Sequence, residues 1–146
     1  SSLTQMRKSW YMFYFQLPWL PEWHVQRNEF AFWTDVMRES SATGTFSDED
    51  LARYRAAWSR EGATTAMINW YRALFQHSED PPREQVDAPT LVVWGESDEY
   101  LLADMARESL EYCADGRLET FPDATHWVNH ERSDRVLRLL EAHLEE

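Results

Sequence analysis

The sequence predicts a helical N-terminal region followed by the closing part of a doubly wound α/β domain. Apolar residues recur every three or four positions up to about residue 76, which is typical of amphipathic helices. Two consecutive prolines then interrupt the pattern at 81–82, and beyond them two short strand-like runs alternate with two helical patterns. We therefore place a domain boundary after residue 80, with a helical domain at 1–80 and an α/β portion at 81–146.

The helices of the first domain are marked by aromatic stripes and by one start signal. Ser47 is expected to cap a helix whose first turn holds the three acidic residues 48–50, and Gly62 is expected to end it. An earlier stripe consists of Phe30, Trp33, Val36 and Met37. A later helix is predicted through Ala66, Met67, Trp70, Tyr71, Leu74 and Phe75. The acidic and proline-containing segment 78–82 is expected to be a linker.

The second domain has the order of predicted strands and helices that is typical of a βαβα unit. The run 90–94, closed by Gly95, suits a strand buried on both faces of a parallel sheet. Helical patterns at 101–112 and 132–144 flank a second strand at 117–121. Because two parallel strands alone leave an exposed edge, we interpret this portion as the end of a larger sheet whose beginning is absent.

Composition excludes several classes of partner and site. The formal net charge is −12, and Lys8 is the only lysine, so nucleic acids and anionic membrane surfaces are poor partners. An acidic, lysine-poor chain is typical of proteins from a high-salt cytoplasm, and no apolar run is long enough to cross a bilayer. The lone Cys113 excludes an intramolecular disulfide or a multi-cysteine metal site, which favours a cytoplasmic protein with an inert thiol.

Two polar side chains follow the two predicted strands. Asp98 lies in the loop after the first strand and His126 in the loop after the second. Since functional groups of open α/β sheets gather at the carboxyl ends of strands, the carboxylate is expected to orient the imidazole as a general base. The structural alternatives are a turn or helix-capping role for Asp98 and an ordinary loop histidine.

Four segments, at 10–18, 69–73, 89–98 and 124–128, together resemble the α/β-hydrolase-fold epoxide hydrolases, a family close to the haloalkane and haloacetate dehalogenases. The resemblance implies the C-terminal part of an α/β-hydrolase fold, namely a helical cap plus the final βαβα of the core sheet. It makes Asp98 the triad acid and His126 the triad histidine, and it assigns two epoxide-activating tyrosines to Tyr11 and Tyr71. Tyr14 leaves the register of the first tyrosine open. Ser133 stands where the resembling sequences usually have proline.

The nucleophile of this family is missing from the sequence. The four glycines frame neither a Gly-x-Asp-x-Gly nor a Gly-x-Ser-x-Gly turn, so the expected aspartate would belong to an N-terminal half that is not part of the chain. We therefore expect the chain by itself to be inactive. A non-catalytic fragment or one partner of a split protein remains the alternative.

The resemblance implies that a small apolar epoxide is opened to a diol through an alkyl-enzyme ester, without cofactor or metal. The residues expected to line the substrate pocket are Trp10, Phe15, Trp70 and Trp127. A dehalogenase is the alternative if Trp10, Trp70 or Trp127 binds a halide, and an upstream serine would give an esterase. The oligomeric state is not indicated by any feature of the sequence.

Overall fold

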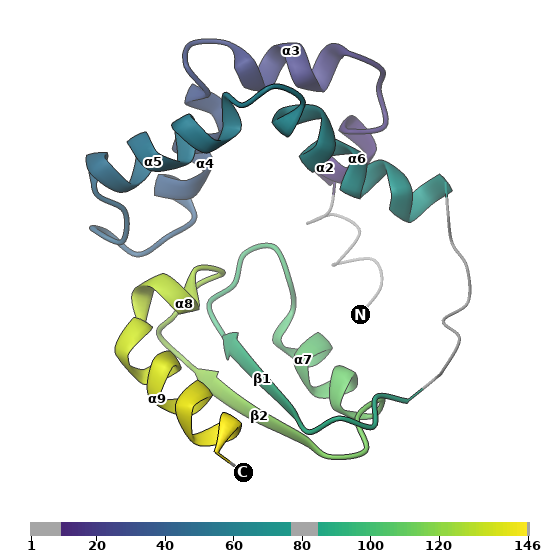
Figure 1. Ribbon diagram of the computed structural model, residues 1–146, viewed down its shortest axis with the longest axis vertical. Coiled ribbons are helices and arrows are strands. Elements are labelled where there is room, and N and C mark those ends of the chain that lie inside the picture. The colour runs from purple at the N-terminus through teal and green to yellow at the C-terminus, as the bar shows by residue number, and fades with distance from the viewer. Residues whose placement is uncertain (1–9, 77–84, 146) are drawn as a thin grey trace. The chain divides into compact units, whose positions relative to one another are not determined.

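A computed structural model describes residues 10–76 and 85–145, which divide into two compact units (Figure 1). The helical unit contains residues 10–39 and 43–76, and the α/β unit contains residues 40–42 and 85–145. The predicted linker at 78–82 and the predicted boundary after residue 80 lie outside the described residues.

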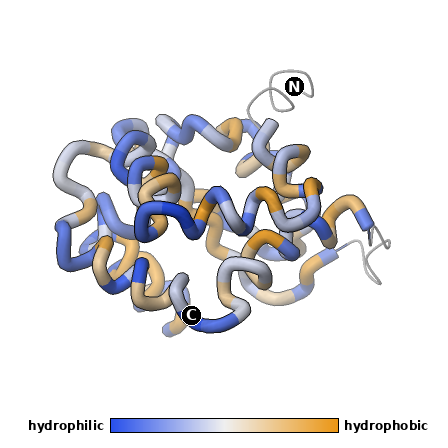
Figure 2. Tube along the Cα trace, turned by 90° about the horizontal axis from the view of Figure 1, so that it is seen from above, coloured by the Kyte–Doolittle hydropathy of each residue, from blue (hydrophilic) through white to orange (hydrophobic). Residues whose placement is uncertain are grey.

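The helical unit is built from five described helices. They are α2 (Trp10–Tyr14), α3 (Leu20–Gln26), α4 (Ala31–Glu39), α5 (Asp48–Trp58) and α6 (Ala63–Gln76). Polar and apolar stretches alternate along these helices, as expected for elements that bury one face (Figure 2). The buried apolar side chains are Phe15, Val25, Phe30, Met37, Phe46, Leu51, Trp58 and Ile68.

Aromatic contacts join α4 to α5 in this core. The rings of Trp33 and Trp58 meet edge to face with centroids 5.0 Å apart, and Phe30 stacks on Trp33 at 6.1 Å. Phe30 itself precedes α4 and has a φ of 63°, so the predicted stripe begins one residue before the helix.

The start of α5 follows the sequence prediction, whereas its end does not. The Ser47 hydroxyl accepts from the Asp50 backbone N–H while the Asp50 carboxylate accepts from the Ser47 backbone N–H, which confirms the predicted cap. The helix ends at Trp58 rather than at Gly62. Gly62, with φ 77°, instead forms the turn that leads into α6, a conformation that glycine adopts without steric cost.

The α/β unit has the predicted order of strand, helix, strand and helix. Its elements are β1 (Thr90–Gly95), α7 (Ala103–Leu110), β2 (Gly116–Phe121), α8 (Val128–Glu131) and α9 (Ser133–Leu144). The strands are parallel, and their register runs from Thr90 opposite Gly116 to Gly95 opposite Phe121. The helices α7 and α9 lie on opposite faces of the sheet (Figure 1).

Packing between the sheet and α9 forms the core of this unit. Phe121 and Ala124 are buried with Val136 of α9, and Val93 of β1 packs against them. The Arg135 guanidinium lies 4.6 Å from the centroid of the Phe121 ring and covers its face. Phe121, the last residue of β2, is thereby fixed immediately before the loop that carries His126.

Three details of the α/β unit differ from the sequence predictions. Residues 90–94 are half-buried rather than buried on both faces, because β2 is the one strand that pairs with β1 among the described residues. The helix α7 spans eight residues of the predicted 101–112. The closing helix starts at Ser133, after the separate short helix α8, since the backbone of Arg132 leaves the helical region.

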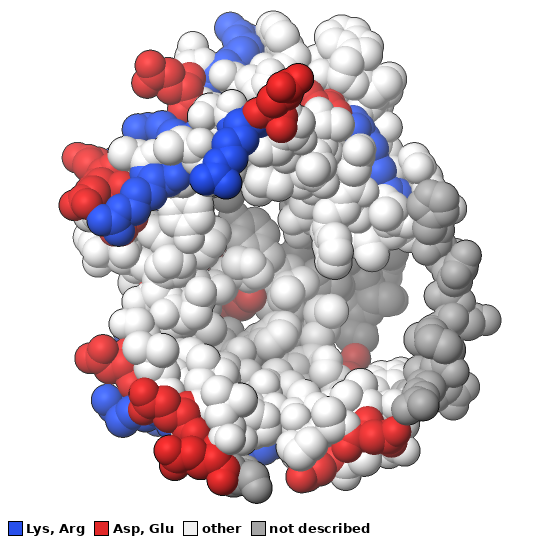
Figure 3. Space-filling view, viewed as in Figure 1, with Lys and Arg blue, Asp and Glu red and all other residues white. Residues whose placement is uncertain are grey.

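The surface carries mainly acidic charge over the α/β unit. On the face shown in Figure 3, carboxylates dominate this unit, whereas arginines and carboxylates alternate over the helical unit. No helix within the two described ranges is long and apolar enough to cross a membrane.

Candidate active site

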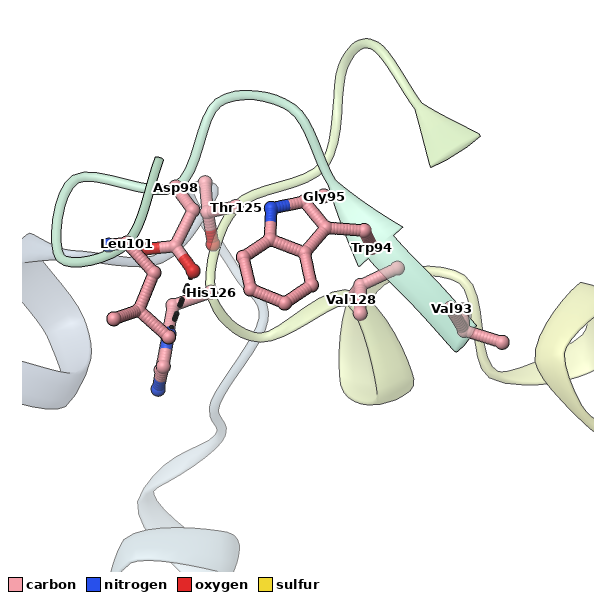
Figure 4. A pocket seen from close by; sticks show the side chains of 8 residues that line it. All are labelled: Val93, Trp94, Gly95, Asp98, Leu101, Thr125, His126 and Val128. Carbon is pink, nitrogen blue, oxygen red and sulfur yellow. Dashed lines mark hydrogen bonds and ion pairs between the residues drawn. The ribbon is translucent and has the colours of Figure 1, made fainter. Parts of the chain in front are cut away.

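Asp98 and His126 meet where the two strands end. The His126 Nδ1 lies 2.8 Å from the Asp98 Oδ2, within hydrogen-bond distance. The Asp98 side chain is 6% exposed and that of His126 is 39% exposed. The imidazole therefore has one nitrogen engaged by a buried carboxylate, while its other nitrogen points away from Asp98 (Figure 4). This is the geometry of an oriented general base.

Asp98 also organises its own loop. Its Oδ1 accepts from the backbone N–H groups of Tyr100, at 2.7 Å, and Leu101, at 3.0 Å. Asp98 therefore stabilises its turn through Oδ1 and contacts His126 through Oδ2. Burial raises the pKa of Asp98, but the hydrogen bonds from His126 and from these two N–H groups outweigh it, so the pKa is lowered overall.

Close approach of the two loops requires a glycine at the end of β1. A Cβ built on Gly95 would lie 2.1 Å from the carbonyl oxygen of Thr125 and 2.5 Å from that of Ala124. The Ser97 backbone N–H donates to the Ala124 carbonyl at 3.0 Å, which fastens the loops together. Gly95 therefore lets the aspartate loop lie directly against the histidine loop.

A small pocket of about 140 Å³ opens beside this pair (Figure 4). Its lining consists of Val93, Trp94, Gly95, Asp98, Leu101, Thr125, His126 and Val128. The wall of the pocket is therefore mainly apolar, with one imidazole and one carboxylate beside it.

The helical unit brings together the two tyrosines that the sequence singles out. The rings of Tyr11, on α2, and Tyr71, on α6, meet edge to face with centroids 5.7 Å apart. Phe15 lies against both, at 5.9 Å from Tyr11 and 5.0 Å from Tyr71. Residues separated by 60 positions in the chain therefore form one aromatic cluster, which places two phenol-bearing side chains side by side.

Tyr14 is engaged elsewhere. Its hydroxyl lies 2.9 Å from the His24 Nδ1, and burial together with the charge of Glu22 raises the pKa of the phenol. Of the two tyrosines that compete for the first position, Tyr11 is the one whose ring pairs with Tyr71.

Known proteins share both the sequence and the fold of this chain. It is 39% identical over 138 residues to AB hydrolase superfamily protein YfhM of Bacillus subtilis (strain 168), covering 93% of the chain and 48% of that protein. It is 32% identical over 150 residues to Epoxide hydrolase 4 of Homo sapiens, covering 98% of the chain and 41% of that protein. The crystal structure of a Bacillus megaterium epoxide hydrolase in complex with an inhibitor matches 100% of the chain and 54% of its own, with a TM-score of 0.82 at 19% identity.

The chain belongs to the epoxide hydrolase-like α/β-hydrolases. Its fold is part of the α/β-hydrolase fold, as predicted. This α/β-hydrolase chain spans about half the length of the curated relatives that it matches, which is consistent with the predicted C-terminal half. A comparison with models of protein families found no match.

The four predicted pocket residues of this α/β-hydrolase have different surroundings. Phe15 is buried in the tyrosine cluster, whereas the residues Trp10 and Trp70 are 62% and 72% exposed. Trp127 is half-buried, and its indole N–H donates to the Ser40 hydroxyl oxygen at 2.9 Å. The indole of Trp127, whose ring contacts His126, is therefore already hydrogen-bonded within the protein, whereas the buried indole N–H of Trp94 in the pocket wall has no hydrogen-bond partner among the described residues.

Two charged residues of the α/β-hydrolase were not singled out by sequence reasoning. Glu131 accepts hydrogen bonds from the backbone and hydroxyl of Thr125, the residue before His126. Arg72, next to Tyr71, donates to the carbonyl oxygens of Phe15 and Leu17. Only its position beside Tyr71 could have drawn attention to Arg72, and no local pattern marks Glu131. Within the described residues, no group of three His, Cys, Asp or Glu side chains could hold a metal ion.

Proposed function

We propose that this chain supplies the water-activating pair and the epoxide-activating tyrosines of an epoxide hydrolase. The helical unit would act as the cap and the α/β unit as the end of the catalytic core, in a cytoplasmic enzyme whose nucleophilic aspartate lies outside the chain. The observation that carries the proposal is the pairing of Tyr11 with Tyr71, in a chain that also joins Asp98 to His126. Relatives named epoxide hydrolases support it.

Ring opening would use the tyrosines. A carboxylate oxygen of the aspartate attacks one epoxide carbon, and the carbon–oxygen bond to the ring oxygen breaks. The hydroxyls of Tyr11 and Tyr71 hydrogen-bond to that oxygen and supply a proton as negative charge develops. Phenols suit this step because their ordinary pKa of about 10 keeps them protonated at neutral pH. The product is a hydroxyalkyl ester of the enzyme.

Ester hydrolysis would use Asp98 and His126. The imidazole takes a proton from water through the nitrogen that points away from Asp98, and the resulting hydroxide attacks the ester carbonyl. The bond between the carbonyl carbon and the alkyl oxygen breaks, and that oxygen takes up one of the two protons of the water as the diol leaves. The other proton returns to the tyrosinate left by ring opening, which restores the aspartate carboxylate, the neutral imidazole and both phenols. Asp98 stabilises the imidazolium that forms between these events.

The tyrosine pair favours epoxide opening over dehalogenation. A leaving halide is stabilised by N–H donors that are available to it. The indole of Trp127 donates to Ser40, whereas the buried indole N–H of Trp94, in the wall of the pocket, has no hydrogen-bond partner among the described residues and makes dehalogenation the second candidate. The tyrosine pair has no counterpart in halide stabilisation but matches the two hydrogen bonds that an epoxide oxygen can accept. A small apolar epoxide is therefore the proposed substrate.

The tyrosine proposal is tested by single hydroxyl deletions in the natural gene product, whatever its length. Diol formation from styrene oxide is measured for Tyr11→Phe and Tyr71→Phe, with Tyr14→Phe as the matched control on α2. Each of the first two variants should lose on the order of 100-fold in kcat, as when a donor to a developing oxyanion is removed. The control should stay within about twofold of the wild type because its hydroxyl bonds to His24. Equal losses in all three variants would contradict the assignment.

The role of His126 is tested separately by trapping. His126→Ala should form the ester with styrene oxide and fail to hydrolyse it, so intact-mass spectrometry should show a stable adduct of one epoxide. Continued release of diol without an adduct would refute the role of His126 while leaving the tyrosine assignment to its own test.

A further inference from the structure

The carboxylate of Glu131 lies at the centre of a hydrogen-bond network around the histidine loop. Glu131 is the last residue of α8, and its side chain accepts three hydrogen bonds. Its Oε2 accepts from the Thr125 backbone N–H at 2.7 Å, while its Oε1 accepts from the Thr125 hydroxyl at 2.7 Å and from the Ala42 backbone N–H at 2.8 Å. All three partners belong to the α/β unit.

This network fixes both neighbours of His126. Thr125, on one side, is held by Glu131 through both its backbone and its side chain. Trp127, on the other side, is held through its indole N–H by Ser40, two residues from Ala42. The short segment 40–42 and Glu131 therefore hold the residues on either side of His126, whose ring is hydrogen-bonded to Asp98.

The three donors require an ionised carboxylate. A carboxylate accepts at both oxygens and donates at neither, whereas an amide of the same size accepts at one end only. In either orientation of such an amide, its NH₂ group would face a backbone N–H, of Thr125 or of Ala42, which would lose its acceptor. Burial raises the pKa of Glu131, but the hydrogen bonds from Ala42 and Thr125 outweigh it and lower the pKa overall, so the ionised form is present at neutral pH.

We infer that Glu131 is a positioning residue for His126, and that it acts on ester hydrolysis rather than on ester formation. The inference rests on the proposed function, in which His126 works only in the hydrolytic step. Glu131 does not touch the reacting atoms in this account. It holds the loop so that the imidazole stays within hydrogen-bond distance of Asp98 and in line with the attacking water.

The kinetic test compares Glu131→Gln with Glu141→Gln, an exposed carboxylate on α9, in the natural gene product. After rapid mixing with styrene oxide, intact mass at successive times gives the rates of ester formation and of ester hydrolysis. Hydrolysis should slow by ~10- to 100-fold in Glu131→Gln, the size seen when a residue that orients a site ligand is removed, with formation within about threefold of wild type. Glu141→Gln should match the wild type in both rates.

Two further measurements keep the test decisive. Thr125→Val removes one of the three donors and leaves the loop backbone intact, so it should slow ester hydrolysis and leave ester formation unchanged even where Glu131→Gln is poorly folded; unchanged hydrolysis in Thr125→Val would count against the inference. The Nδ1 proton of His126, shared with Asp98, should give a proton NMR signal downfield of the amide region that Glu131→Gln loses and Glu141→Gln keeps. This signal needs no substrate.

The outcomes separate the inference from the proposed function. If the wild type forms no ester, the proposed function fails, and the NMR comparison still decides whether Glu131 positions His126. Equal slowing of formation and hydrolysis in a folded Glu131→Gln would show a general structural role and overturn the inference. Unchanged hydrolysis with an unchanged NMR signal would overturn it as well.

Discussion

Replacing Arg72 with methionine should destabilise the helical unit more than any exposed ion-pair change in the chain. The guanidinium donates to both carboxylate oxygens of Glu22, at 2.6 and 3.1 Å, from its two terminal nitrogens. It also donates to the carbonyl oxygens of Phe15, at 2.9 Å, and Leu17, at 2.7 Å. One side chain of α6 thus holds the segment that follows α2 and a carboxylate of α3.

The magnitude follows from burial and from the partners left behind. The side chains of Arg72 and Glu22 are each 15% exposed, so this pair is largely screened from water. Removing one partner of a buried pair costs about 3–5 kcal/mol because the other charge remains without compensation. Methionine keeps most of the apolar volume of the arginine stem. We therefore expect a loss of about 3 kcal/mol in the free energy of unfolding.

The control is Arg53→Met on α5. Arg53 pairs with Glu49, and the two side chains are 72% and 76% exposed. Exposed pairs contribute about 0–1 kcal/mol, so the control should lose no more than that. Urea unfolding at neutral pH, followed by tryptophan fluorescence and far-UV circular dichroism, gives both values.

The pH dependence provides a second check on the same pair. The hydrogen bond from Arg72 lowers the pKa of Glu22, and this outweighs the opposing effect of burial. A carboxylate with a lowered folded pKa contributes stability that is complete above its unfolded pKa of about 4.3 and disappears as the pH falls through the folded pKa. The difference between wild type and Arg72→Met should therefore shrink below pH 4.3. A loss in Arg72→Met no larger than in Arg53→Met at neutral pH would refute the reasoning.

Three other predictions concern the α/β unit and the surface. Gly95→Ala should displace the histidine loop, since its new Cβ would fall 2.1 Å from the Thr125 carbonyl oxygen, and it should lower diol formation at least ~10-fold; crystallography of the variant would show whether the loop moves. Asp98→Asn should remove the stability that the lowered pKa of Asp98 provides above its unfolded pKa of about 3.9, so that the unfolding free energy depends less on pH below 4; an unchanged dependence would contradict the cited hydrogen bonds. With a net charge of −12, the protein should gain thermal stability as KCl is raised from 0.1 to ~2 M, because salt screens repulsion among carboxylates; a flat melting temperature would count against adaptation to salt.

The sequence predicted those features that local chemistry determines. The run of β-branched residues before Gly95 predicted β1, and the serine and aspartates at 47–50 predicted the start of α5. Both depend on contacts within a few residues. The end of α5 was predicted wrongly because Gly62 marks the turn before α6, whereas the helix already ends at Trp58 with Ser59 as its C-cap.

Long-range contacts explain what could not be predicted. The bonds that join Ser40 to Trp127 and Ala42 to Glu131 span 87 and 89 positions, and no local pattern encodes them. The distinction between Tyr11 and Tyr14 likewise depends on a partner, His24, that lies ten residues away. Because functional groups of an open α/β sheet gather at the carboxyl ends of its strands, the sequence did predict that Asp98 and His126 would lie together. Their catalytic roles, like those of the tyrosines, stay predictions.

The parallel register of β1 and β2 limits where insertions can be accepted during evolution. Gly95 and Phe121 are the last registered pair, and the loops that bear Asp98 and His126 begin directly after them. A one-residue insertion within either strand would shift its end by about 3.3 Å, more than a hydrogen bond tolerates, and would turn its side chains to the opposite face. An insertion in the crossover that contains α7 would leave that pairing untouched. Length variation among natural homologues should therefore accumulate between the strands and be excluded from them.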